Sequence, residues 1–239
     1  MKILSNILDK FVKKASLNGS ITSINLEFKE DGLHSSVKSV DNVALTRVFL
    51  PAKAFGDYTA MGEIFVKDAV TFSKYLKTFS EVVSLELCNE YMLKITGESR
   101  DALVMLGAEI VCENVWRKDL PTIPVTERVL VSKDQLARTV SDVSLLKINQ
   151  VVIKKTKDKL VFEVGQQDES DFFVNTVETR EQSNGEATVK LGTMFATLYS
   201  VLDGDVEIKL GNDVPIIAFE KKDDMEFTCL IAPVVESKD

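Results

Sequence analysis

The stretch Glu113-Asn-Val-Trp-Arg-Lys-Asp-Leu-Pro-Thr-Ile-Pro-Val-Thr-Glu127 divides the chain into two halves of nearly equal length. Pro121 and Pro124 stand three residues apart, and a proline lacks the backbone N–H that a helix interior or a central strand requires. A residue that precedes a proline also avoids the helical region. The sequence therefore predicts an extended connector at 113–127 between one domain at 1–112 and a second at 128–239.

The two halves repeat the same order of hydrophobic patterns. The first half predicts helices at 5–16 and 68–79, with strands at 24–28, 33–37, 43–50, 83–87, 92–96 and 102–106. The second half predicts helices at 133–146 and 190–202, with strands at 128–131, 151–154, 160–164, 172–177, 206–210, 216–219 and 227–231. Corresponding elements are offset by about 122–127 residues, which indicates an internally duplicated α+β unit with two helices on mostly antiparallel strands.

Composition is that of an ordinary globular protein. The 239 residues are 45% hydrophobic and 28% charged. Apolar runs fall far short of the roughly 18 residues that a membrane helix needs, and Asn6 and Asp9 interrupt the first one, so no signal peptide is expected. Cys88, Cys112 and Cys229 are isolated, which favours a reducing compartment over a disulfide framework.

Charge is unevenly distributed between the halves. The formal net charge is −8; residues 1–118 carry 15 basic and 15 acidic side chains, whereas residues 119–239 carry 14 and 22. An acidic chain is not a simple nucleic-acid binder. Any contact with DNA would have to be local or topological.

Lysines nevertheless gather opposite the apolar faces of both helices predicted in the first half. These lysines have few acidic neighbours, although a solvated helix face is the simpler alternative. In the second half, Arg138 on helix 133–146 is accompanied by Asp134 and Asp142, and the outer face of helix 190–202 has hydroxyl groups and no charge. The candidate basic residues of the first half are Lys10, Lys13, Lys14, Lys67, Lys74 and Lys77.

Motifs for catalysis and for phosphate or metal binding are missing. GxGxxG, GxxxxGK[ST], HExxH and GxSxG do not occur, and His34 is the single histidine. Two acidic groups could bind a divalent cation, but both fall in turn-like polar segments where solvated acids are common. They are Asp168, Glu169 and Asp171, and Asp223, Asp224 and Glu226. We expect no catalytic residue, metal site or cofactor.

Several motifs, in their order and spacing, resemble the proliferating cell nuclear antigen family of DNA sliding clamps over essentially the full length. The most specific are Asn212-Asp-Val-Pro-Ile-Ile-Ala-Phe219 and Phe227-Thr-Cys-Leu-Ile-Ala-Pro-Val-Val235. Gly32-Leu33, followed by Asp41-Asn-Val-Ala-Leu45, and the Thr122-Ile-Pro124 connector are also similar to family motifs. The family lysine that follows its last proline is Val234 here, which alters the rim of the partner pocket.

The resemblance implies a polymerase processivity factor without catalysis. Family members form closed homotrimers whose inner helices surround duplex DNA and contact it independently of sequence, which would reconcile inward lysines with an acidic outer surface. Lys10, Lys74, Lys77 and Arg138 match basic positions of these helices, whereas helix 190–202 lacks the usual basic residues. An intracellular location follows, cytoplasmic, nucleoid or nuclear, including that of a viral protein in a host cell.

The family also binds DNA polymerase, clamp loader, nuclease or ligase through short peptides with one glutamine and two aromatic residues. By matched position, an apolar pocket under the connector would receive these aromatics. Its residues would be Val43, Leu45, Ile123, Pro124, Pro215, Ala232 and Pro233; for Val43 and Leu45 a plain core role is an equal alternative. Ring closure would use the edge strands at 102–110 and 172–179.

Other hypotheses remain open at this point. The chain could be a subunit of a heterotrimeric or checkpoint-type clamp, because self-pairing and cross-pairing depend on how the edge strands match. It could be a monomeric viral processivity factor, although that would need a more basic DNA face. An enzyme that uses a metal at Asp168–Asp171 is the alternative from another class.

Overall fold

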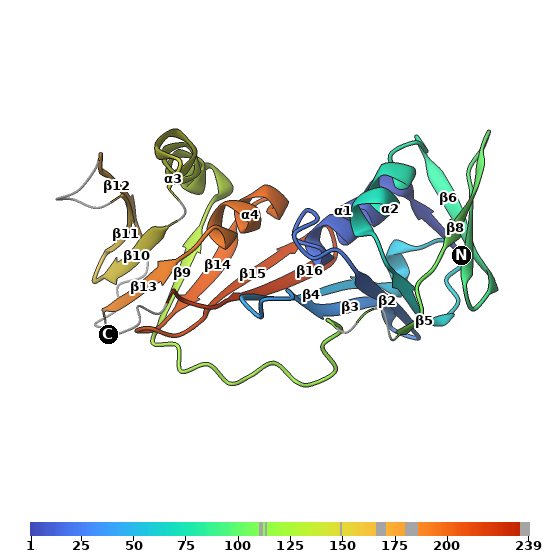
Figure 1. Ribbon diagram of the computed structural model, residues 1–239, viewed down its shortest axis with the longest axis horizontal. Coiled ribbons are helices and arrows are strands. Elements are labelled where there is room, and N and C mark those ends of the chain that lie inside the picture. The colour runs from blue at the N-terminus through green and yellow to red at the C-terminus, as the bar shows by residue number, and fades with distance from the viewer. Residues whose placement is uncertain (110–111, 113, 149, 166–170, 180–185, 235–239) are drawn as a thin grey trace. The chain divides into compact units, whose positions relative to one another are not determined.

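The computed structural model describes residues 1–239 except 110–111, 113, 149, 166–170, 180–185 and 235–239. The chain divides into two compact units. Unit 1 comprises residues 1–40, 45–118 and 221–227, and unit 2 comprises residues 41–44, 119–220 and 228–239. Each unit is described separately below and in Figure 1.

Unit 1 contains two helices and two antiparallel sheets. The helices are α1 (Ser5–Ala15) and α2 (Ala69–Leu76), and a 3-10 turn, η1, covers Ala52–Ala54. One sheet has the order β1-β6-β7-β8, from Lys2–Leu4, Val82–Asn89, Met92–Thr96 and Asp101–Met105. The other sheet contains four neighbouring strands, in the order β5 (Gly62–Val66), β2 (Ile24–Lys29), β3 (Gly32–Lys38) and β4 (Ala44–Pro51).

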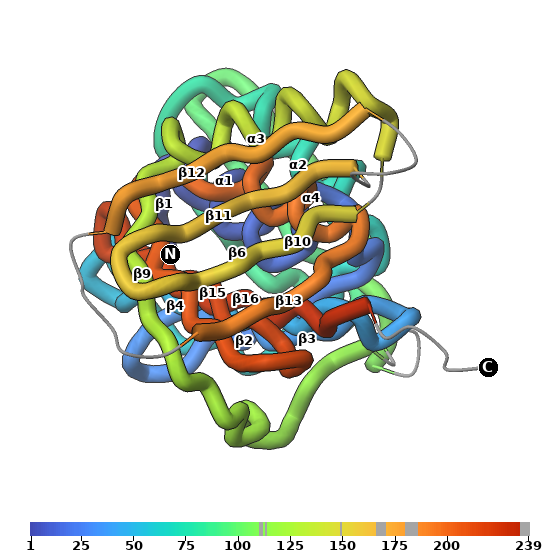
Figure 2. The backbone as a smooth tube through the Cα atoms, turned by 90° about the vertical axis from the view of Figure 1, so that its left-hand side faces the viewer, coloured from blue at the N-terminus to red at the C-terminus, as the bar shows by residue number. Residues whose placement is uncertain are grey.

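Unit 2 repeats this plan. Its helices are α3 (Lys133–Leu146) and α4 (Met194–Val201). One sheet has the order β12-β11-β10-β13, from Phe173–Glu178, Lys159–Val164, Val151–Thr156 and Ala187–Leu191, and Figure 2 shows these strands side by side. The other sheet contains four neighbouring strands, in the order β16 (Met225–Ile231), β15 (Ile216–Lys222), β14 (Val206–Leu210) and β9 (Glu127–Val131).

Alternating strand residues and one face of each helix form the cores. In unit 1, Phe11 of α1, Phe28 of β2 and Phe72 of α2 are fully buried. In unit 2, the rings of Phe162 on β11 and Phe195 on α4 have centroids 5.8 Å apart. Complete burial of a side chain of this size is worth about 1.5–3 kcal/mol relative to exposure, so these aromatics fix the helices against the sheets.

The turn between β2 and β3 depends on Gly32. The residue has a φ of 149°, and a Cβ at this position would lie 2.2 Å from the carbonyl oxygen of Leu50 on β4. Only glycine allows the strands to approach so closely. The turn thereby sets the register in which Leu33 pairs with Leu50 and His34 with Phe49.

The predicted α+β duplication, with two helices and antiparallel sheets in each half, is confirmed. The helix expected at 190–202 is wrong at its beginning, because Ala187, Val189 and Leu191 are buried at alternate positions of β13 and α4 begins only at Met194. The pattern analysis also missed β5 and β13, both of which are five residues long. Short strands of this kind give too few repeats for a clear period.

Candidate functional surfaces

Helices α1 and α2 of unit 1 carry the exposed lysines. On α1, Leu8, Phe11 and Val12 are buried and Lys10 is exposed. On α2, Phe72 and Leu76 are buried whereas Lys74 and Lys77 are exposed. Both helices thus use one face for packing and present ammonium groups on the other, as expected of an amphipathic helix on a sheet.

Lys67 is exposed two residues before the start of α2 at Ala69. Asp68 is the N-cap of α2, where its carboxylate accepts a hydrogen bond from the Thr71 backbone N–H at 2.9 Å and from the Thr71 hydroxyl at 2.6 Å. These bonds stabilise the charged carboxylate, so the pKa of Asp68 is lowered, chiefly by the Thr71 hydroxyl. The cap satisfies a helix N–H that would otherwise have no partner.

Lys13 and Lys14 do not join the exposed set. The Lys13 ammonium lies 2.6 Å from the carboxylate of Asp9, which also accepts a hydrogen bond from Ser73 of α2. Lys14 is 3% exposed, and its ammonium lies 5.2 Å from the ring centroid of Phe227. Lys14 stands three residues after Phe11, at the margin of the apolar face, so the expectation that it is exposed beside Lys10 is wrong.

The helices of unit 2 present a different surface. Ser132 and Gln135 form a capping box at the start of α3, whose exposed residues include Asp134 and Arg138. Asp142 accepts a hydrogen bond from the side-chain amide of Asn175 at 2.6 Å. On α4, whose start is marked by Thr193, the exposed positions are hydroxyl residues without charge, Thr193 and Ser200.

Six of the residues expected to form the peptide pocket fall within unit 2. Val43, Ile123, Pro215, Ala232 and Pro233 are half-buried, and Pro124 is exposed. The backbone N–H of Ala232 donates to the carbonyl of Val43 at 2.8 Å, which joins the end of β16 to this segment. The seventh residue, Leu45, belongs to unit 1 and is 8% exposed, which suits the core alternative for this residue.

The connector meets unit 2 at Gly211. A Cβ at Gly211 would lie 2.7 Å from the carbonyl oxygen of Pro124 and 2.7 Å from the Val214 side chain. The Thr126 N–H also donates to the carbonyl of Leu210 at 2.8 Å. Pro124 is therefore held close to the segment that leads into Pro215, and in Figure 1 residues 119–126 lie on the side of β14 and β15 opposite α4.

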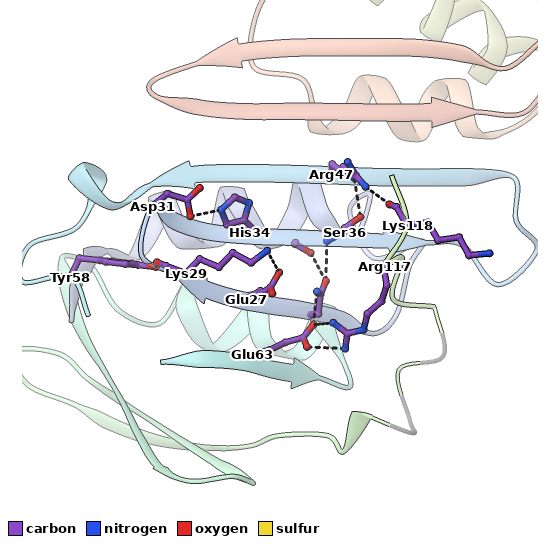
Figure 3. Close-up of polar contacts among 12 residues, drawn as sticks. Glu27, Lys29, Asp31, His34, Ser36, Arg47, Tyr58, Glu63, Arg117 and Lys118 are labelled. Carbon is purple, nitrogen blue, oxygen red and sulfur yellow. Dashed lines mark hydrogen bonds and ion pairs between the residues drawn. The ribbon is translucent and has the colours of Figure 1, made fainter. Parts of the chain in front are cut away.

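In unit 1, two arginines fasten the start of the connector (Figure 3). The Arg117 guanidinium forms a bidentate pair with Glu63 at 3.1 and 2.8 Å and also contacts Glu109 at 2.7 Å. These acceptors raise the Arg117 pKa above its ordinary value. Arg47 donates to the Lys118 carbonyl and to Ser36. Bidentate pairs restrict geometry more than a single ion pair does, so residues 117–118 are well fixed.

Among the residues that the structure describes, strands β8 and β12 are both outermost in their sheets, so one side of each has no neighbouring strand there. Exposed apolar side chains accompany these edges. Leu103 and Met105 on β8 are 63% and 58% exposed, and Val174 on β12 is 53% exposed. An edge with apolar side chains is a surface on which another strand can pair.

Three of the residues considered for catalysis or metal binding have other partners. His34 contacts Asp31 at 2.9 Å (Figure 3), and its ring lies against the Phe49 ring. Asp224 pairs with Lys53, and Glu226 with Lys221. Asp168 and Glu169 lie outside the described residues. Among the residues that the structure describes, no group of three His, Cys, Asp or Glu could hold a metal ion.

Within the described ranges, the helices are too short or too polar to cross a bilayer.

Solved structures provide the comparison with known proteins, since neither the family models nor the curated proteins match this sequence. Archaeoglobus fulgidus PCNA, solved with the C-terminal region of FEN-1, has a TM-score of 0.84 at 21% identity and covers 99% of this chain and 98% of its own. PCNA from Entamoeba histolytica has a TM-score of 0.83 at 14% identity, with 98% of each chain covered. The PCNA2–PCNA3 complex of Sulfolobus tokodaii gives 0.76 at 17%, with 98% of this chain and 99% of that chain covered. The chain therefore has the PCNA fold.

Proposed function

We propose that this chain, which has the PCNA fold, is a DNA sliding clamp that forms a ring around duplex DNA and keeps polymerases and other enzymes on it. The observation that carries the proposal is the combination of a duplicated fold with two outermost strands, β8 and β12, that expose apolar side chains. Pairing of β8 from one chain with β12 of the next would close a ring of three copies. Retention on DNA would then be topological and would need little affinity.

The acidic net charge of −8 supports this mode of binding. An acidic protein is repelled by DNA in free solution, because the phosphate backbone is negative as well. A closed ring with lysines on its helices avoids this conflict, since attraction is needed only inside the ring. The contacts would be with phosphates and independent of base sequence.

Partner binding is proposed for the surface around the connector, residues 113–127. Ile123, Pro124 and Pro233 are apolar side chains that are not fully buried, although they are in or beside segments fixed by hydrogen bonds. Such a surface suits the aromatic anchors of a short peptide. The polymerase, loader, nuclease or ligase would be held there while the chain itself performs no chemistry.

A heteromeric ring is the second candidate. It is favoured by the likeness to the PCNA2–PCNA3 complex of Sulfolobus tokodaii, in which two different chains assemble. In that case, β8 of this chain would pair with an edge strand of a different subunit.

The test is the solution mass, measured by light scattering over a concentration series, followed by a topological DNA assay. A homomeric clamp is expected to have the mass of three chains. It should thread onto a linear 60-bp duplex with free ends but not onto the same duplex whose ends have been blocked beforehand with streptavidin. A single-chain mass at micromolar concentration would contradict the homotrimer, and equal binding to free and blocked duplexes would contradict encirclement.

A further inference from the structure

The exposed lysines of α1 and α2 are not balanced by acids on the same surface. Lys10 lies on α1, and Lys74 and Lys77 lie on and just after α2. Of the two nearby acids, only Asp9 is paired with a lysine. Asp9 is 6% exposed and bound to Lys13 and Ser73, and Asp68 caps α2 through Thr71. Asp68 remains a charged carboxylate, but Lys10, Lys67, Lys74 and Lys77 are all exposed, so this helix surface carries three more exposed positive charges than negative ones.

The helix surface of unit 2 has no such excess. On α3 and at its C-cap, the exposed Arg138 and Lys147 are offset by the exposed Asp134 and the half-buried Asp142. The exposed residues of α4 are hydroxyls, Thr193 and Ser200. Hydroxyl groups bond to a phosphate only in direct contact, whereas an ammonium attracts it over a Debye length of about 10 Å at 0.1 M salt.

Lys133 does not compensate for this difference. It stands at the start of α3, and its ammonium donates to the carbonyl of Leu202, just after α4, at 2.5 Å. The same ammonium lies 5.2 Å from the centroid of the Tyr199 ring. The charge is thus used to join the two helices of unit 2, in the way that cations stabilise helix C-termini.

We propose that the electrostatic hold on DNA is confined to unit 1 and is carried by Lys10, Lys74 and Lys77, while the helices of unit 2 form a neutral, hydroxyl-lined surface. The proposal rests on the proposed function, because the ligand is the phosphate backbone of duplex DNA. In a ring of three chains, basic and neutral sectors would alternate around the duplex. The DNA would be drawn towards the basic sectors and would slide past the neutral ones.

The experiment compares binding to a fluorescent linear duplex with free ends between 50 and 200 mM salt, by anisotropy. One variant is Lys10→Gln/Lys74→Gln/Lys77→Gln, and its matched control has the same loss of charge at exposed lysines away from the helices, Lys118→Gln/Lys157→Gln/Lys159→Gln. A third variant, Arg138→Gln, removes the exposed cation of α3. A fourth, Thr193→Lys/Ser200→Lys, places charge on α4. Circular dichroism and light scattering verify folding and assembly of each variant.

The slope of log Kobs against log[salt] reports how many phosphates are neutralised. We expect the helix triple variant to lower the slope by about 0.9 for each phosphate that it no longer neutralises, with a smaller change in the control and in Arg138→Gln. Thr193→Lys/Ser200→Lys should bind more tightly and raise the slope, because it supplies the charge that unit 2 lacks.

The proposal is overturned if the helix triple variant and its control behave alike, or if Arg138→Gln reduces the slope as much as the triple variant. Neither outcome contradicts the proposed clamp if the protein still has the mass of three chains and still binds only a duplex with free ends. A different result would reject the ring and keep the assignment to unit 1. In that case the protein would have the mass of one chain, would bind free and blocked duplexes equally, and would still need the three lysines for binding. Failure of the native protein to bind duplex DNA would reject both.

Discussion

At the scale of single residues, position around a helix decides what a lysine can do. Lys10, Lys13 and Lys14 lie within five residues of one another, yet only Lys10 is exposed. Lys13 is drawn to Asp9, which is fixed by Ser73 of the neighbouring helix. Lys14 is buried against Phe227, where a cation over an aromatic ring offsets part of its desolvation. Charge at a helix surface is therefore not the same as charge available to a ligand.

Asp68 is the residue at which a single side chain determines the start of a helix. Replacing it in Asp68→Ala should reduce the free energy of unfolding by about 1 kcal/mol at pH 7, the usual value of an N-cap. The pKa of Asp68 is lower in the folded chain than its ordinary value near 4. The stabilisation is thus fully present above the ordinary pKa and is lost as the pH falls through the lowered pKa.

Urea unfolding of the native chain and of Asp68→Ala, carried out between pH 7 and pH 2.5, measures this difference. Glu98→Ala, which removes an exposed carboxylate from a loop, is the control for the change in net charge. A difference that stays constant down to pH 2.5 would show that the carboxylate charge at Asp68 is not what stabilises α2.

At the scale of elements, the connector is fixed at both ends and presents apolar side chains between them. At the start of the connector, Arg117 pairs with Glu63 and Glu109. Near its end, the carbonyl oxygen of Pro124 lies so close to Gly211 that a larger residue would not fit there. Two prolines at 121 and 124 keep the segment extended. This leaves Ile123 half-buried in a chain segment that has little freedom to lose when a partner binds, which favours affinity.

Charged substitutions at the connector should therefore weaken the proposed peptide binding without affecting the fold. We expect Ile123→Asp and Pro233→Asp to weaken binding of a synthetic peptide with one glutamine and two aromatic residues at least tenfold, because a carboxylate would have to be desolvated beneath an aromatic ring. Isothermal titration calorimetry measures the affinity, and light scattering verifies assembly.

Thr122→Asp is the matched control for these substitutions, since Thr122 is an exposed polar neighbour on the same segment. If Ile123→Asp binds the peptide as the native chain does, the pocket lies elsewhere. Equal weakening by Thr122→Asp would indicate a general effect of negative charge.

At the scale of the whole molecule, the proposed assembly would depend on strands that the fold leaves at the edges of its sheets. β8 is outermost in the order β1-β6-β7-β8, and β12 is outermost in the order β12-β11-β10-β13. A buried pairing of these edges would satisfy their free backbone groups and cover Leu103, Met105 and Val174. A closed ring would leave neither of these apolar edges open to aggregation.

Leu103→Glu/Met105→Glu should convert the assembly into single chains, because carboxylates at the edge would be desolvated on pairing. Both residues are largely exposed in the single chain, so its melting temperature should stay within a few degrees of the value for native chains diluted to the single-chain state. Light scattering gives the mass, and Val40→Glu, at a residue that is 88% exposed, is the control. A variant that retains the mass of three chains would show that the ring is closed by another surface.

Taken by itself, the sequence determined the duplication, the connector and the amphipathic faces, because each of these follows from local rules. Two prolines exclude helix at 121–124, and repeated apolar spacing marks both pairs of helices. It could not determine that β13 ends at Leu191 before α4 begins, since Leu191 fits the apolar pattern of either element. Short strands such as β5 acquire their structure from the neighbours that pair with them.

Only the tertiary structure decided which charges remain available. Lys14 is removed from the surface by Phe227, more than two hundred residues later in the chain, and Lys133 is held by the end of another helix. Arg117 is fixed by Glu63 and Glu109 from separate segments of unit 1. Such pairings join residues that are distant in sequence, and a periodic pattern carries information only about neighbours along the chain; burial and charge pairing are properties of the packed molecule.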